Sequence, residues 1–175
     1  MKRLIIGISG ASGVGLGLKV IRALPERIEK YIIVSEHANV VLEKEENRFL
    51  LDDHDIGAIT ASGSFKSDGM MIVPCSMNTL AKISYGIADN LLSRTAAVML
   101  KEKRPLLLAP REMPFSPIAL ENMLKLSTLG VHIAPPILGY YAHIQTLEDM
   151  ENFLIGKWFD LFGIEHTLFK RWEGM

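Results

Sequence analysis

A charged pair, Arg111 and Glu112, directly follows an apolar run at 106–109 that is typical of a buried strand. The pair is therefore expected at the end of that strand rather than at an arbitrary surface position. A guanidinium suits a planar phosphate or carboxylate, and a neighbouring carboxyl group can donate or accept a proton. A structural ion pair or a helix-capping glutamate would explain the same two residues, so anion binding is one of two interpretations.

Small residues gather at 9–13, Ser-Gly-Ala-Ser-Gly, after another apolar run at 3–8. Backbone N–H groups of such a loop can approach a phosphate at a helix start, and Ser12 adds a hydroxyl. The segment is not G-x-G-x-x-G, and no Walker lysine follows it. A tight strand-to-helix turn without a ligand explains it equally well.

The segment 74–79, Pro-Cys-Ser-Met-Asn-Thr, follows a third apolar run and indicates a helix start with Ser76 as N-cap. Cys75 is the single cysteine of the chain, and on its own it is more typical of a buried packing residue than of a nucleophile. One cysteine cannot form an internal disulfide. This fits a reducing compartment and predicts a cytoplasmic protein.

These loops need a scaffold that brings strand ends together, and the alternation of apolar runs with helical periodicity provides it. Strands are expected at 3–8, 30–34, 70–73, 105–109 and 131–134, and helices at 14–24, 37–46, 79–85, 90–103, 117–129 and 147–162. The polar stretch 47–67 is expected to be irregular.

This alternation predicts an α/β fold, a single Rossmann- or flavodoxin-like domain over 1–175 with a mostly parallel sheet and helices on both faces. In an open parallel sheet, ligands bind beyond the carboxyl ends of the strands. The three segments described above all lie at such ends.

Composition restricts the function classes. Lys and Arg number 19 against 20 Asp and Glu, so no global charge draws the protein to nucleic acid or to an anionic membrane. A bound anion must be held by a local cluster. The uncharged segments 4–18 and 126–147 are rejected as a signal peptide and a membrane span, because glycines interrupt the first, and prolines and histidines the second. No Asp-rich metal motif is visible, so no metal is expected.

A set of short motifs spans the chain from the first strand to the C-terminus. They are Gly10-Ala-Ser-Gly13, Ala61-Ser-Gly-Ser64, Pro74-Cys-Ser-x-x-Thr79, Ala88-Asp-Asn-Leu91, Arg94-x-Ala-x-Val98, Leu100-Lys-Glu-x-Arg104, Pro110-Arg-Glu-x-Pro114, Leu120-Glu-Asn-Met-Leu124 and Arg171-Trp172. In this order and with this spacing, the set resembles the UbiX/Pad1 flavin prenyltransferase family.

The resemblance implies a metal-independent prenyltransferase that joins the dimethylallyl group of dimethylallyl monophosphate to N5 and C6 of reduced FMN. The product, prenylated FMN, would serve a UbiD-type decarboxylase, and the enzyme would be a homododecamer built from trimers. The chemistry agrees with the residue types, because cations and hydroxyls suit a departing phosphate while aromatic faces suit an allylic cation.

The resemblance also assigns site residues by position. The implied flavin contacts are Gly10, Ala11, Ser12, Ser35, Ser76, Met77, Asn78, Thr79, Arg94 and Arg111. The implied prenyl-phosphate contacts are Ser62, Gly63, Lys101, Arg111, Tyr141 and Lys157. The implied catalytic residues are Glu45, Glu112, Ser12 and Trp172. Glu112, expected next to Lys101, would move the proton that flavin C6 loses, unless the leaving phosphate is the base.

Three positions depart from the family pattern. Lys157 stands where arginine is usual and lacks the bidentate fork, Ala142-His143-Ile144 follows Tyr141, and Val14-Gly15-Leu16 lacks a bulky residue. Two other functions stay open. One is an FMN-dependent cysteine decarboxylase of a related flavoprotein group, for which His54 is the only conceivable histidine. The other is a non-catalytic, FMN-carrying subunit of an aromatic-acid decarboxylase.

Overall fold

The computed structural model describes residues 2–36, 38, 47–140 and 144–171. The chain divides into two compact units, Met1–Pro135 and Pro136–Met175, and each is described by itself. The helix expected at 37–46 lies outside the described residues, apart from position 38. This division does not test the prediction of one domain over 1–175, which stays a prediction.

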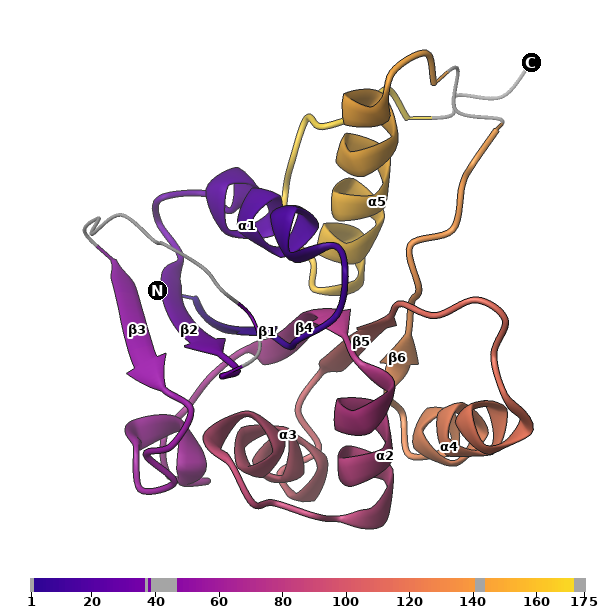
Figure 1. Ribbon diagram of the computed structural model, residues 1–175. Helices are drawn as coiled ribbons and strands as arrows, with labels where there is room; N and C mark the ends of the chain where they lie inside the picture. Colours follow the sequence, from indigo (N-terminus) through magenta and orange to yellow (C-terminus); the bar gives the residue numbers. More distant parts are fainter. Residues whose placement is uncertain (1, 37, 39–46, 141–143, 172–175) are drawn as a thin grey trace. The chain divides into compact units, whose positions relative to one another are not determined.

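The first unit contains a parallel sheet (Figure 1). Its strands are β1 (Arg3–Ile8), β2 (Glu29–Val34), β3 (Arg48–Asp52), β4 (Gly69–Cys75), β5 (Leu106–Pro110) and β6 (His132–Ile133). They lie in the order β3-β2-β1-β4-β5-β6, and each neighbouring pair is parallel. This is the Rossmann order rather than the flavodoxin order. The predicted α/β class is confirmed.

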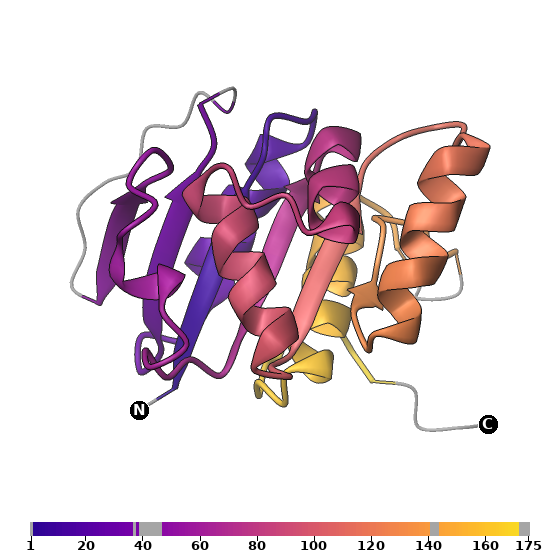
Figure 2. The same ribbon diagram turned by 90° about the horizontal axis from the view of Figure 1, so that it is seen from below.

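Helices cover both faces of this sheet. Helix α1 (Val14–Ala23) packs on β1 and β4 from one face. Helices α2 (Met77–Tyr85), α3 (Leu91–Lys101) and α4 (Pro117–Thr128) lie side by side across the other, as Figure 2 shows. A short 3-10 turn, η1 (Ile59–Ala61), packs beside α3.

Burial explains why the strands are apolar along their whole length. All seven residues of β4 and all five of β5 are buried. This is expected for inner strands of a parallel sheet, which pair with another strand on each side. Gly17 allows α1 to approach the sheet, because a Cβ at this position would collide with the carbonyl oxygen of Val73. The close approach fixes the start of α1 beside the end of β4.

Two expectations from the sequence are corrected. The stretch 47–67 contains strand β3, which its exposed residues concealed: Phe49 and Leu50 are 44% and 62% exposed. An edge strand is paired on one side only and needs no fully buried apolar run. In addition, β4 and β5 do not stop before Pro74 and Pro110 but include them.

The second unit contains helix α5 (Leu147–Leu161), which begins with a reciprocal capping box between Thr146 and Asp149. The segment 162–171 folds back on this helix, and Gly156 leaves room for the Phe169 ring. Arg171 donates to Asp160 at 2.7 Å and, together with His166, lowers the pKa of that carboxyl group. No helix in the described part of the chain is long and apolar enough to cross a membrane.

Candidate active site

The ends of β1 and β4 are joined by a buried serine. The Oγ of Ser9 donates to the Pro74 carbonyl at 2.9 Å and accepts the Ser76 amide at 2.7 Å. Ser76 in turn caps α2: its Oγ accepts the Thr79 amide at 3.2 Å and lies 3.0 Å from the Thr79 hydroxyl. Since the strand order reverses between β1 and β4, this junction is the topological switch point of the sheet.

A cavity of about 340 Å³ opens at this junction, and it is called here the switch-point cavity. Five of the residues predicted to contact a flavin line it: Gly10, Ser35, Ser76, Asn78 and Thr79. Its size lies in the range of sites for small ligands. The cavity wall therefore presents hydroxyl and amide groups at the position where Rossmann-type sheets bind nucleotides.

The loop of small residues at 9–13, called here the glycine loop, lies beside this cavity and leaves the start of α1 uncapped. Gly13 is the N-cap residue, its φ of 104° is in the left-handed region, and it has no side chain to accept a hydrogen bond. Ser12 and Gly13 are exposed. The first amides of α1 thus lack a side-chain acceptor, which suits an anionic group at this helix start.

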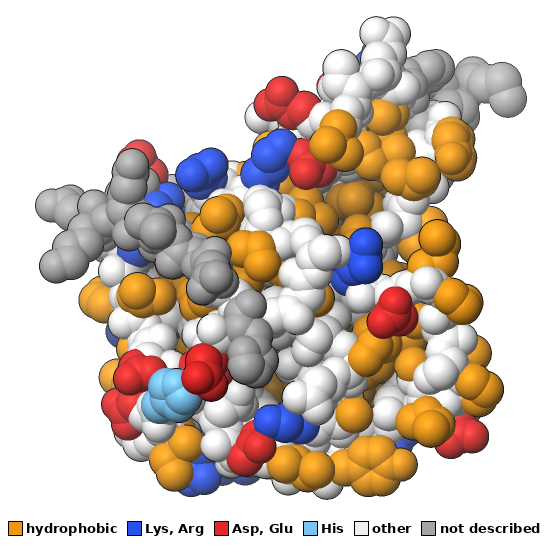
Figure 3. All heavy atoms as spheres, viewed as in Figure 1, with side chains coloured by type: hydrophobic (Ala, Val, Ile, Leu, Met, Phe, Trp, Pro, Cys, Tyr) orange, Lys and Arg blue, Asp and Glu red, His pale blue; other side chains and the backbone are white. Residues whose placement is uncertain are grey.

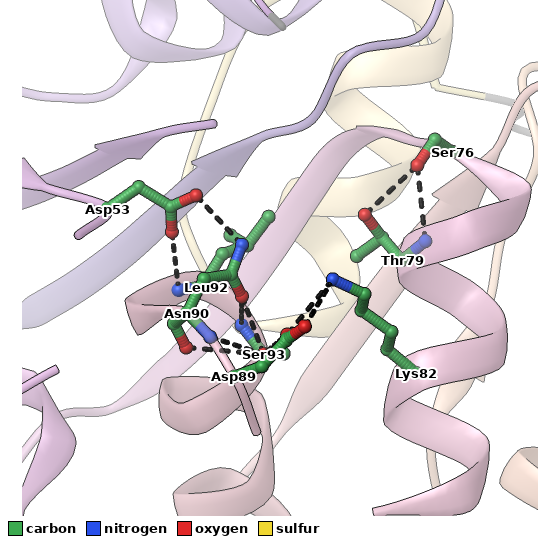
Figure 4. Close-up of polar contacts among 8 residues, drawn as sticks. All are labelled: Asp53, Ser76, Thr79, Lys82, Asp89, Asn90, Leu92 and Ser93. Carbon is green, nitrogen blue, oxygen red and sulfur yellow. Dashed lines mark hydrogen bonds and ion pairs between the residues drawn. The ribbon is translucent and has the colours of Figure 1, made fainter. Parts of the chain in front are cut away.

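The opposite wall is built around Asp53, directly after β3. Its buried carboxylate accepts the Leu92 amide and the Asn90 side-chain amide, each at 2.8 Å (Figure 4). Asn90 caps α3, because its Oδ1 accepts the Ser93 amide at 2.9 Å. Asp53 therefore fixes the start of α3 against the end of β3, and both of its carboxylate oxygens accept hydrogen bonds there.

Lys82 and Asp89 connect α2 with the segment before α3. The Lys82 Nζ lies 3.0 and 2.8 Å from the two carboxylate oxygens of Asp89 (Figure 4). Hydrogen bonding from Lys82 holds the pKa of Asp89 below its usual value. Both residues line the switch-point cavity, as do Glu36 and His54.

A second cavity, of about 560 Å³, lies beside α3 and is called here the α3 cavity. Ser62, Gly63, Arg94 and Lys101 line it, so it collects three predicted prenyl-phosphate contacts and one predicted flavin contact. Arg104 holds the 62–65 loop by donating to the Gly63 and Phe65 carbonyls, each at 2.6 Å. Lys101 donates to Glu102 at 3.0 Å and lowers the pKa of that carboxyl group.

Sequence comparisons decide the family. The Flavoprotein family model matches residues 1–159. The chain is 49% identical to a flavin prenyltransferase UbiX of Helicobacter pylori, covering 97% of this chain and 98% of that protein. A flavin prenyltransferase UbiX of Campylobacter jejuni is 45% identical, covering 98% of each. The chain belongs to the UbiX flavin prenyltransferase family.

Solved structures of UbiX-like proteins agree with this fold. AnUbiX, crystallised with FMN and dimethylallyl pyrophosphate, has a TM-score of 0.92 and 38% identity and covers 99% of this chain and 98% of its own. A dodecameric, FMN-dependent UbiX-like decarboxylase from Escherichia coli O157:H7 has a TM-score of 0.91 and 40% identity, covering 98% and 100%.

For a flavin prenyltransferase, the arrangement of the predicted residues within one chain is informative. Arg111 and Glu112 follow β5; the Arg111 amide donates to the Cys75 carbonyl at 3.1 Å, and both side chains are exposed. Glu112 accepts the amide of the next residue at 3.0 Å. The expectation that Glu112 lies next to Lys101 is wrong within one chain. Helix α3 runs antiparallel to the strands, so Lys101, at its last turn, lies near the amino end of β5. Glu112 follows the carboxyl end of the same strand.

The remaining predicted residues of the UbiX-type site are distributed as follows. Ala11 and Ser12 lie in the glycine loop, and Met77 is the first residue of α2. Lys157 is exposed on α5 of the second unit. Glu45, Tyr141 and Trp172 lie outside the described residues. Cys75 is fully buried, and burial raises the pKa of its thiol, as expected for a packing residue.

Sequence reasoning missed the wall formed by Asp53, Lys82 and Asn90 of this UbiX-like chain. The motif at 88–91 enters only through the resemblance, although Asn90 and Ser93 form a capping box at the start of α3. Asp53 stood in a stretch expected to be irregular. Among the described residues, no group of three or more His, Cys, Asp or Glu side chains is placed to hold a metal ion.

Proposed function

We propose that the chain transfers the dimethylallyl group of dimethylallyl monophosphate to N5 and C6 of reduced FMN, without a metal ion. The products are prenylated FMN, inorganic phosphate and the proton that C6 loses, and a UbiD-type decarboxylase receives the prenylated flavin. The observation that carries this proposal is the switch-point cavity, where Gly10, Ser35, Ser76, Asn78 and Thr79 meet in a chain of the UbiX family.

The residues present fit FMN. The uncapped amides of α1 and the glycine loop suit its phosphate, and the hydroxyls of Ser35, Ser76 and Thr79 suit a polyol chain. These groups are fixed by strand ends and helix starts rather than by long side chains. The flavin supplies the nucleophilic atoms when bound, and the protein binds and orients it.

The prenyl donor needs positive charge around its phosphate as the bond to carbon breaks. Arg94 and Lys101, with Ser62 and the backbone at Gly63, supply cations and a hydroxyl in the α3 cavity. Fixed cations aimed at a developing negative charge lower the barrier of such a step, which is the part that a metal ion plays in other phosphate chemistry. Arg111, Tyr141 and Lys157 are proposed to complete this phosphate site, and Glu112, Glu45, Ser12 and Trp172 the reacting centre.

The two cavities contact different parts of α3, one at its start and the other further along the helix, yet the two substrates must meet. We therefore propose that the α3 cavity of one copy faces the switch-point cavity of another in a homo-oligomer, with a dodecamer as the expected assembly. The UbiX-like relative from Escherichia coli O157:H7 is dodecameric. Exposed apolar residues of this chain provide surface for assembly, among them Ile118, Leu120 and Leu124 of α4, and Figure 3 shows hydrophobic side chains over this helix. We also propose that 1–175 acts as one domain in a cytoplasmic protein.

The deciding experiment mixes the pure protein with reduced FMN and dimethylallyl monophosphate under anaerobic conditions. Mass spectrometry should show a flavin heavier by one C5H8 unit. FMN that is bound but never gains this mass would make the chain a carrier. Dimethylallyl pyrophosphate in a parallel reaction tests the choice of donor, because AnUbiX was crystallised with that compound.

A cysteine-terminated peptide tests the decarboxylase alternative, since His54 lines the switch-point cavity. Oxidative decarboxylation of that peptide without any prenylation of FMN would replace the proposed function.

A further inference from the structure

Arg104 follows the end of α3 and reaches the 62–65 loop, but it does not line the α3 cavity. Its Nη1 donates to the Phe65 carbonyl and its Nη2 to the Gly63 carbonyl, each at 2.6 Å. Its side chain is only 11% exposed. Charge-assisted bonds of this length are strong, so one guanidinium fixes two carbonyl groups of the loop.

The contact with the Gly63 carbonyl also sets the direction of the next amide. In a planar trans peptide, the carbonyl and the N–H point in opposite directions. Because the Gly63 carbonyl points to Arg104, the Ser64 amide points away from it, and this amide donates to the Ser62 Oγ at 3.3 Å. Arg104 is therefore connected, through one peptide plane, to a hydroxyl group that lines the α3 cavity.

The Ser62 hydroxyl is oriented by this contact. Its oxygen accepts the Ser64 amide, so its proton points elsewhere. The Ser64 Oγ lies 2.8 Å from the Ser62 Oγ, and either hydroxyl can be the donor. When the Ser64 hydroxyl donates, the Ser62 proton is available to an anion in the α3 cavity, at the end of a chain of hydrogen bonds.

The loop backbone at Gly63 also lies close to the end of α3. A Cβ at this position would collide with the Glu102 carboxylate and come within 2.9 Å of the Lys101 Nζ. Glycine thus lets the Lys101 ammonium approach the loop. The ammonium and the Ser62 hydroxyl both line the α3 cavity, so one anion can be reached by both.

The segment on either side of this loop has its own anchors. The buried hydroxyls of Thr60 and Thr95 lie 3.0 Å apart and join η1 to α3. The buried Phe65 ring packs edge-on against Tyr31, with the ring centroids 4.8 Å apart. These contacts hold the segment on the protein, and Arg104 adds a defined direction to the backbone between them.

We propose that Arg104 is a positioning residue for the prenyl donor: by holding the Gly63 carbonyl, it directs the Ser62 hydroxyl at the donor phosphate. The proposal rests on the proposed function, in which the α3 cavity holds that phosphate. A role confined to stability would not depend on Ser62. Neither would a role exerted through Glu102, whose Oε2 lies 3.9 Å from the Arg104 Nη2.

The test is a double-mutant cycle of Arg104→Met and Ser62→Ala, with Arg104→Lys as a further variant. Lys103→Met is the charge-matched control, because this exposed neighbour does not line the α3 cavity. Thr95→Val is the stability-matched control, because it removes the other tie between this segment and α3. Calorimetry measures the affinity of the FMN-saturated proteins for inorganic phosphate, and thermal unfolding measures their stability.

Arg104→Met and Ser62→Ala should each weaken phosphate binding about tenfold, as expected when a hydrogen bond to a charged group is lost. The double variant should bind no more than about twofold more weakly than Ser62→Ala, since both changes remove one contact. Arg104→Lys should lose affinity several-fold, because an ammonium does not replace the fork. FMN affinity should stay constant. Both controls should bind phosphate as wild type does, although Thr95→Val should unfold at a lower temperature.

Additive losses in the double variant would overturn the proposal, and so would a loss in Thr95→Val equal to that in Arg104→Met. Wild-type phosphate affinity in Arg104→Met or Arg104→Lys would also overturn it. If Arg104→Met does not fold, the same cycle is run with Arg104→Lys. A wild-type protein that makes no prenylated FMN from either donor would instead refute the proposed function. Formation of prenylated FMN, with a phosphate affinity independent of Arg104, would refute only the role of Arg104.

Discussion

The switch-point cavity and the α3 cavity share one helix but are built in different ways. Asn90 and Ser93, at the start of α3, face the first, where short side chains and backbone amides form two hydrogen-bonded groups, one around Ser76 and one around Asp53. Arg94 and Lys101 face the second, and both are exposed. The first cavity is thus preorganised by the fold, whereas the second relies on charge carried by long side chains.

This difference teaches how one helix can serve two substrates. Arg94, Val98 and Lys101 follow the spacing that places residues on one side of a helix, and Asn90 and Ser93 lie at its start. The helix has 11 residues and spans about 16 Å, so its first turn lies near the carboxyl ends of the strands and its last turn near their amino ends. A polyol and its phosphate match the rigid cavity, and a leaving phosphate matches the cationic one.

The largest expected effect belongs to a residue that lines neither cavity. Glu112→Gln should leave FMN binding and donor binding intact but slow product formation about 100-fold, the lower range for loss of a general acid or base. Single-turnover measurements at saturating donor isolate this step. Glu121→Gln, an exposed substitution on α4, is the control. Full-speed turnover would show that Glu112 has no part in the reaction. A loss of donor affinity alone would show that Glu112 only positions the Arg111 side chain.

The next effect distinguishes the two cavities by substrate. Lys101→Ala should raise the donor concentration needed for half-maximal rate tenfold or more, because a charge-assisted hydrogen bond of about 1.5–3 kcal/mol is lost. FMN affinity should not change. Steady-state kinetics and flavin titration measure the two quantities, and Lys103→Ala removes a nearby charge that does not line the cavity. A parallel loss of FMN affinity would mean that the cavities do not divide the substrates in this way.

The rigid wall can be tested through Asp53. Asp53→Ala leaves the Leu92 amide and the Asn90 side chain without their acceptor, which should cost about 1–3 kcal/mol of stability. Thermal unfolding of the flavin-free protein measures this loss, and FMN titration should show weaker binding. Asp55→Ala, in the exposed turn that follows, should cost less. Equal stability of the two variants would show that Asp53 does not organise the wall.

The sequence predicted one wall of the switch-point cavity and missed the other, for a physical reason. Ser9 and Ser76 follow buried strands, and a buried strand can be recognised in the sequence as an apolar run. Parallel pairing then brings the carboxyl ends of these strands to the same end of the sheet. The pairing of Asp53 with Asn90 depends on β3, an edge strand whose exposed residues carry little periodic signal. Asp53 and Asn90 are 37 positions apart in the sequence. They meet because of the order of the strands in the sheet, which no local sequence pattern specifies.

The position of Lys101 illustrates a second limit. The helix expected at 90–103 places Lys101 near a helix end, as the structure does. The resemblance, however, places Lys101 beside Glu112, and within one chain these two residues lie near opposite ends of β5. A sequence motif records which residues act together and not whether they come from the same copy. The same limit applies to Arg94, which the resemblance groups with the flavin contacts and which lines the α3 cavity within one chain.

The smallest expected effect concerns Glu102, whose Oε1 accepts a hydrogen bond from Lys101 at 3.0 Å. At neutral pH this carboxylate competes with the donor phosphate for the same ammonium. Glu102→Gln should therefore bind inorganic phosphate about two- to threefold more tightly, a modest gain because an exposed pair is weak. Titration calorimetry measures it, and FMN affinity is the control that should stay unchanged.

The pH dependence gives this last prediction its sign. Hydrogen bonding from Lys101 holds the pKa of Glu102 below its ordinary value of 4.5, so the carboxyl group stays ionised until the pH falls below that value. The wild-type protein then gains a proton on Glu102 and loses the competing charge, so its phosphate affinity should approach that of Glu102→Gln in acid. The ratio of the two affinities should thus be largest at neutral pH and fall towards one below pH 4.5. Weaker phosphate binding by Glu102→Gln at neutral pH would give the opposite answer: the carboxylate would then position Lys101 for the donor, and the α3 cavity would be as preorganised as the switch-point cavity.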